Sequence, residues 1–110
     1  MTIKEFTEKY GLFETLTNEW DDEVVDTWEI NNKVGDFLST KEAKRYKFLA
    51  NNTDGWCLRL EKSNEEEEYR VIGNEYAYER FFDGDTTMTE VYKYLLESME
   101  ADMRKRIQKA

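Results

Sequence analysis

Residues 87–109 read TMTEVYKYLLESMEADMRKRIQK and carry the strongest helical periodicity in the chain. Apolar side chains recur in this stretch every three or four positions, which is the spacing of one face of an α-helix. Thr87 and Glu90 have the spacing of a capping box, and basic residues close the segment, as the helix dipole favours. We therefore expect a helix from about Thr87 to Lys109, roughly 33 Å long, that lies across the rest of the fold. Its apolar stripe comprises Met88, Val91, Tyr92, Leu95, Leu96, Met99, Met103 and Ile107.

A second capping box predicts a short helix at the N-terminus. Thr2 and Glu5 have the required spacing, and Gly11 after Tyr10 is the usual residue just past a helix end. The following stretch, Leu12 to Glu23, has helix-compatible apolar spacing but few strong helix formers. The sequence leaves open whether that stretch is a helix or a loop.

Between these helices the apolar pattern changes to the alternation of β-strands. Trp56, Leu58 and Leu60 point to one face of an extended segment, and clusters of Asn, Asp and Gly mark the turns. Thr40 to Ala50 suits a helix as well as a strand, and we expect a strand from about Arg45.

Together these elements predict an α+β fold in a single domain over residues 1–110. We expect an antiparallel sheet of four to five strands between about Val24 and Phe82, the first strand running from Val24 to Ile30. The long C-terminal helix packs across one face of this sheet, and the short N-terminal helix lies at one edge.

The composition of the chain excludes several kinds of catalytic and metal site. The chain has 110 residues, and 16 Lys and Arg against 25 Asp and Glu give a formal net charge of −9. It has no histidine and one cysteine, which excludes imidazole-based catalysis and a disulfide within the chain. Zinc and iron–sulfur sites lack ligands, so we expect no metal and no other cofactor. No apolar run approaches the ~18 residues that span a bilayer, and no signal peptide is recognisable, so we expect a cytoplasmic protein without a membrane partner.

The N-terminal segment carries a spaced apolar pattern around one glycine, made of Ile3, Phe6, Tyr10, Gly11, Leu12, Leu16 and Trp20. This pattern is similar to the helix-turn-helix segments of excisionase-like regulators of phages and bacteria. The position of a recognition helix, Phe13 to Glu23, contains no Lys or Arg and five acidic residues, which repel phosphates. We therefore expect no direct binding of nucleic acid, and we interpret the segment as a helical cap over the core.

The candidate partner-binding residues are Glu65, Glu66, Glu67, Glu68, Tyr76 and Tyr78. The four glutamates follow one another at a predicted hairpin turn, and we expect them to join other acids in a surface that docks on a basic protein. The two tyrosines are the candidate aromatic anchors, because their segment has more rings than one strand face can bury.

The leading functional hypothesis is a non-enzymatic protein-binding module. It rests on the missing catalytic residue types, the excess of acid and the many aromatic side chains. In composition the chain resembles the accessory and inhibitor proteins of bacteriophages and mobile elements, which implies a basic, nucleic-acid-binding partner. One alternative is a structural or assembly protein that forms homo-oligomers through the C-terminal helix. A second alternative is a small carboxylate-dependent enzyme or ligand-binding domain.

Overall fold

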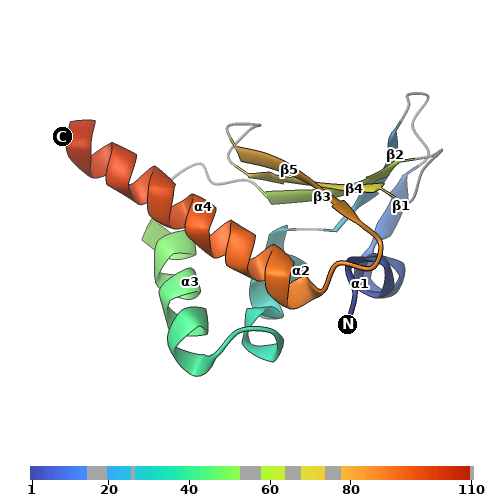
Figure 1. The fold of residues 1–110 in the computed structure, drawn as a ribbon, viewed down its shortest axis with the longest axis horizontal. Coiled ribbons are helices and arrows are strands. Elements are labelled where there is room, and N and C mark those ends of the chain that lie inside the picture. Colours follow the sequence, from blue (N-terminus) through green and yellow to red (C-terminus); the bar gives the residue numbers. More distant parts are fainter. Residues whose placement is uncertain (15–19, 26, 53–57, 64–67, 74–77, 110) are drawn as a thin grey trace.

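The computed structural model describes residues 1–14, 20–25, 27–52, 58–63, 68–73 and 78–109. It has an α+β fold in which the helices lie on one face of an antiparallel sheet (Figure 1). In chain order the elements are α1 (Ile3–Tyr10), β1 (Leu12–Glu14), β2 (Trp20–Val24), α2 (Thr27–Asn32), the 3-10 helix η1 (Val34–Asp36), α3 (Thr40–Asn52), β3 (Leu58–Ser63), β4 (Glu68–Gly73), β5 (Tyr78–Asp83) and α4 (Met88–Lys109).

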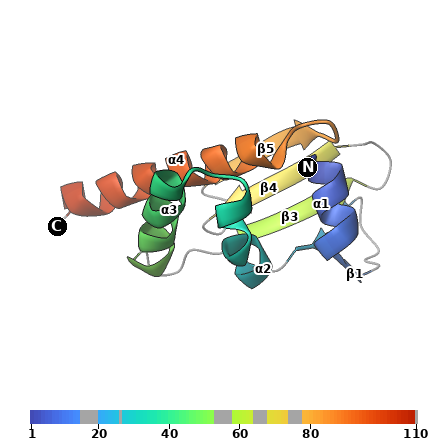
Figure 2. The same ribbon diagram turned by 90° about the horizontal axis from the view of Figure 1, so that it is seen from below.

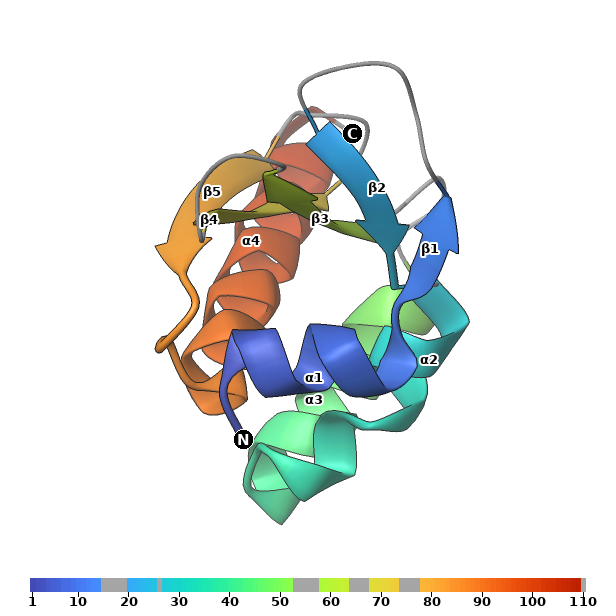
Figure 3. The same cartoon turned by 90° about the vertical axis from the view of Figure 1, so that its right-hand side faces the viewer.

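The sheet follows the order of the chain, β1-β2-β3-β4-β5, and each strand runs antiparallel to the next. Figure 3 shows the sheet curving over α4 from β5 to β1, with α1 beneath it. Leu60 faces Val71 across β3 and β4, and Tyr69 faces Phe82 across β4 and β5. These four side chains are buried, so this face of the sheet supplies one wall of the core.

Helix α4 supplies the opposite wall of the core, as the apolar stripe predicted. Its first three turns bury Met88, Val91, Tyr92, Leu95 and Met99. Leu96 and Met103 are only partly buried, and Ile107, near the end of the helix, is 65% exposed. The predicted helix from about Thr87 to Lys109 is therefore present, and its buried stripe ends before its last two turns.

The predicted N-terminal helix is present as α1, with its capping box. The Thr2 hydroxyl accepts the Glu5 N–H at 3.2 Å, while a Glu5 carboxylate oxygen accepts the Thr2 N–H at 2.9 Å. The helix ends where the Gly11 N–H donates to the Thr7 carbonyl at 2.8 Å. A Cβ atom at Gly11 would lie 2.5 Å from that oxygen, so only glycine allows this close approach.

The predicted extent of the sheet is wrong. Among the described residues, only β3, β4 and β5 lie between Val24 and Phe82, and the expected strand from Val24 to Ile30 is replaced by helix α2 beyond its first residues. The remaining strands, β1 and β2, come from Leu12 to Glu23, a stretch we had expected to be a helix or a loop. The pairing of β2 with β3 holds β2 in an extended conformation. This pairing depends on tertiary structure rather than on the local preference of the residues.

The strand expected from about Arg45 is also wrong, because Thr40 to Ala50 belongs to helix α3. Ser39 and Glu42 form a capping box there, in which the Ser39 hydroxyl accepts the Glu42 N–H at 3.2 Å. The buried residues Ala43, Tyr46 and Leu49 follow at steps of three, which places them on one helical face. Tyr46 and Ala50 fit either period, but the capping box and Leu49 fit only the helix.

The first residues of the chain are tied to the start of α4. Thr2 forms an antiparallel bridge with Thr87, and the Ile3 N–H donates to the Thr86 carbonyl at 2.8 Å. The Met1 carbonyl accepts the Met88 N–H at 2.9 Å and so satisfies an amide in the first turn of α4. Among the described residues, no helix combines the length and apolar character needed to cross a bilayer.

Leu95→Ala should lower the free energy of unfolding by about 2–5 kcal/mol, because truncating a fully buried leucine leaves a cavity. Leu95 is 1% exposed in the middle of α4. Urea unfolding followed by circular dichroism measures the change. Leu96→Ala is the matched control, since Leu96 is only partly buried and should lose less. Equal losses at the two positions would contradict the burial of this face of α4.

Candidate functional site

The structure separates the two described members of the predicted partner-binding set. Glu65, Glu66, Glu67 and Tyr76 lie outside the described residues. Glu68 begins β4 opposite Asp83, whereas Tyr78 begins β5 opposite Gly73. Five residues of extended strand separate Glu68 from Gly73, which is about 16 Å. Glu68 and Tyr78 therefore lie at opposite ends of the same strand pair.

Tyr78 also faces the helical layer rather than the uncovered side of the sheet. It shares a strand face with Arg80 and Phe82, whose side chains meet Tyr94 of α4. The Nζ atom of Lys105, near the end of α4, lies 5.3 Å from the centroid of the Tyr78 ring. In this position the ring packs between β5 and α4.

One end of the sheet places acid opposite acid. Glu68 is the cross-strand partner of Asp83, and Glu14 is the cross-strand partner of Asp22. Both pairs lie toward the end at which Trp20 faces Ser63. Like charges directly opposite one another destabilise a strand pair. The pairing of Glu68 with Asp83 therefore costs the fold some stability.

Asp83 has a second, structural role at this end. Its Oδ1 atom accepts the Asp85 N–H at 3.1 Å and the Thr86 hydroxyl at 3.2 Å. These two hydrogen bonds shape the turn between β5 and α4. The Asp83 carboxylate is thus held in place opposite Glu68, and its charge adds to the acidic end of the sheet.

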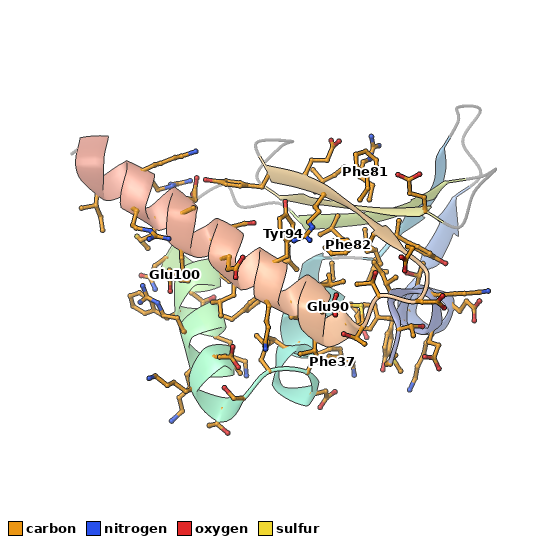
Figure 4. The ribbon with its side chains drawn as sticks, viewed as in Figure 1. Phe37, Phe81, Phe82, Glu90, Tyr94 and Glu100 are labelled. Carbon is orange, nitrogen blue, oxygen red and sulfur yellow. The ribbon has the colours of Figure 1, made fainter. Side chains whose placement is uncertain are left out.

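Phe81 is the exposed aromatic residue of this face, and sequence reasoning missed it. Alternation along β5 sends Phe82 toward α4, where it is 7% exposed, and sends Phe81 the other way, where it is 46% exposed (Figure 4). Phe81 stands between Glu79 and Asp83 on the uncovered face, opposite Arg70 of β4. Two adjacent phenylalanines in a strand must face opposite sides of the sheet. This alternation was the feature of the sequence that could have predicted an exposed ring on β5.

A groove of about 360 Å³ lies on the helical side of the molecule. It is lined by Glu42, Lys93, Leu96, Glu97, Glu100 and Arg104. At its edge the Arg45 guanidinium holds Glu100, with Nε to Oε1 at 2.5 Å and Nη2 to Oε2 at 2.9 Å. Hydrogen bonds from Arg45 lower the pKa of the Glu100 carboxyl, and hydrogen bonds from Ser39 lower the pKa of Glu42. Both carboxyls are therefore ionised at neutral pH and cannot serve as proton donors there.

The described segments contain no evident site for a metal ion. Within them, no three side chains of His, Cys, Asp or Glu are grouped so that they could hold a metal ion.

Charge is divided unevenly between the layers of the fold. Helices α3 and α4 together contain nine Lys and Arg against five Asp and Glu, whereas the rest of the chain contains seven against twenty. Figure 2 shows α3 and the C-terminal half of α4 at the end of the molecule away from α1 and β1. The longest dimension of the molecule is 42 Å. The structure thus has a basic helical end, which the net charge of −9 conceals.

Comparison with protein families, with curated protein sequences and with solved structures found no match to this chain. The assignment of a functional surface therefore rests on the geometry and electrostatics described above.

Glu68→Lys should raise the free energy of unfolding by about 0.2–1 kcal/mol, because it turns a repulsive cross-strand pair with Asp83 into an attractive one. Thermal unfolding at low ionic strength measures the change. Glu68→Gln is the matched control, since it removes the repulsion without adding an attraction, and it should give a smaller gain. Destabilisation by Glu68→Lys would contradict a repulsive pair at this position.

Glu100 should titrate below the ordinary glutamate pKa of about 4.3, because its ionised form accepts hydrogen bonds from Arg45. Its stabilising contribution is present at neutral pH and is lost as the pH falls through the pKa of the folded state. Carbon-detected NMR titration of the carboxyl group measures that pKa directly. Arg45→Gln should return the pKa toward the ordinary value. Arg104→Gln, which removes only a weaker Coulombic contribution, should shift it less.

Proposed function

We propose that this protein is a non-enzymatic binding protein that docks the uncovered face of its sheet on a basic partner protein. The observation that carries the proposal is the exposed Phe81 ring with Glu79 and Asp83 on either side of it, on a face that no described helix covers. The repulsive pairing of Glu68 with Asp83 beside it supports the proposal, because such a pair costs stability that a cationic partner would restore.

Each part of this surface has a distinct physical role in binding. An aromatic side chain that is already exposed and held by a strand loses little conformational entropy on binding, which suits an anchor at the centre of an interface. Carboxylates around it steer a basic partner and fix its orientation more than they add affinity. The glutamates at positions 65–67 precede Glu68 in the chain, and they extend the same charge in this proposal.

The proposed partner is a protein whose basic surface binds nucleic acid. A carboxylate surface competes with phosphates for the same Lys and Arg side chains, so the protein would act as an inhibitor or accessory factor in the cytoplasm. This is the role that the compositional resemblance to phage and mobile-element inhibitors implies. The protein itself is not expected to bind nucleic acid through this face, because its charge repels phosphates.

The two rival functions draw less support from the geometry. Self-association through the α4 stripe required that stripe to be exposed, and its first three turns are buried. A carboxyl that acts as a general acid at neutral pH needs a pKa raised toward neutrality. The shifted carboxyls of the described residues, Glu5, Glu42 and Glu100, all have lowered pKa values.

Binding to a fluorescein-labelled peptide of Lys and Arg with one central leucine tests the proposal by fluorescence anisotropy. Phe81→Ala should weaken binding about fivefold, the loss typical of an interface anchor. Ile107→Ala is the control, because it truncates another exposed apolar side chain at the far end of α4. Equal affinities of Phe81→Ala and the unmodified protein would contradict an anchor at Phe81.

The charge component is tested separately by stopped-flow kinetics with the same peptide. Replacing Glu65, Glu66, Glu67 and Glu68 with Gln should lower the association rate more than it raises the dissociation rate. Glu8→Gln removes an exposed acid from α1 and serves as the control for net charge. Association should slow as salt rises, because charges are screened over about 8 Å at physiological ionic strength. Binding that is indifferent to salt would contradict the acidic surface.

A further inference from the structure

Helix α3 presents a basic outer face with an exposed aromatic ring on it. Lys41 and Lys44 are exposed, and Phe48 is 51% exposed. At 3.6 residues per turn, Phe48 lies one turn beyond Lys44 and Arg45 and two turns beyond Lys41, so it shares their face. The opposite face of α3 carries the buried residues that pack against the core. The proposed function makes no use of this outer face.

The Phe48 ring is fixed in place by contacts that reach α4. The guanidinium carbon of Arg45 lies 5.3 Å from the centroid of the Phe48 ring. The same guanidinium is held by two hydrogen bonds to Glu100 of α4, at 2.5 and 2.9 Å. Figure 4 shows Glu100 on α4 where α3 packs against it. An exposed ring that is already oriented binds an apolar group with little further loss of conformational entropy.

We propose that this outer face of α3 is a second docking surface, for an acidic peptide segment of a partner protein that inserts an apolar side chain against Phe48. Lys41 and Lys44 supply charges complementary to carboxylates, and the Phe48 ring supplies the apolar contact. The surface prefers the charge opposite to that preferred by the sheet, so the protein would hold a basic and an acidic partner at the same time.

The two surfaces can act independently because screening is short compared with the molecule. Helix α3 lies on the other side of α4 from the uncovered face of the sheet (Figure 1), and the Debye length at physiological ionic strength is about 8 Å. The acidic sheet therefore does not cancel the local potential of α3. At low salt the net negative charge of the protein weakens the long-range attraction of an acidic peptide. At physiological salt the lysines of α3 dominate its binding.

The arrangement favours an acidic peptide over nucleic acid. Bidentate recognition of phosphate uses the fork of an arginine, and two donors of the Arg45 fork are already used by Glu100. The remaining cations on the face are lysines, which act as point charges and suit carboxylates equally well. A nucleic acid is also a long polyanion that extends past α3 toward the acidic remainder of the chain, whereas a short peptide contacts α3 alone.

The test uses a fluorescein-labelled ten-residue peptide of Glu and Asp with two central leucines, titrated at physiological salt. Lys44→Glu should weaken binding at least fivefold, and Phe48→Ala should weaken it about fivefold. Phe48→Leu should restore part of the loss. Lys9→Glu, an equal change of charge on exposed α1, is the control and should have no effect. Circular dichroism checks that each variant folds.

Four results would overturn the proposal. They are the absence of peptide binding, equal binding by the α3 variants, tighter binding of a single-stranded oligonucleotide of the same charge, and self-association in sedimentation that the same variants abolish. The third result would assign the face to nucleic acid, and the fourth would assign it to a second copy of this chain.

Discussion

The contacts of Tyr92 join α4 to the other helices. Its hydroxyl donates to the Ile30 carbonyl at 2.6 Å, its ring stacks on Phe37 at 5.4 Å, and the edges of Phe6 and Tyr46 meet it at 6.4 and 5.9 Å. One side chain of α4 thus contacts α1, α2, α3 and the segment after η1. Burial raises the pKa of the Tyr92 phenol far above its ordinary value, so the donor stays protonated wherever the protein is folded. The positions of α1, α2 and α3 relative to α4 depend on this junction.

Local signals predicted the parts of the fold that local interactions determine. The α4 stripe and the Thr2 capping box are complete within a few turns of chain, and both predicted their helices correctly. Strand β2 and helix α3 were missed for different reasons. β2 is extended because it pairs with β3, some forty residues later in the chain. In α3, apolar residues at Tyr46 and Ala50 fit both periods, and the capping box between Ser39 and Glu42 is the local feature that favours the helix.

The candidate surfaces were only partly predictable for a related reason. The excess of acidic residues is visible in the composition, but the location of their side chains depends on strand register. The register places Glu68 opposite Asp83 and Tyr78 at the other end of the same strand pair. The basic face of α3 could not be predicted once that stretch was expected to form a strand, because a strand would send Lys44 and Arg45 to opposite sides. The exposure of Phe81 follows from alternation, yet which of two phenylalanines is buried depends on where α4 lies.

The bridge between Thr2 and Thr87 has a consequence for how the chain acquires its structure. These residues are eighty-five positions apart, and the hydrogen bonds beside them join the Met1 carbonyl to the first turn of α4. During synthesis α1 emerges before α4, on which it docks. Helix α1 can therefore dock only after α4 has been made. Contacts of such long range slow folding, since loop closure is entropically costly before they form. An intermediate that lacks α4 would expose the face of the sheet on which α4 packs. That exposed apolar face would be prone to aggregation.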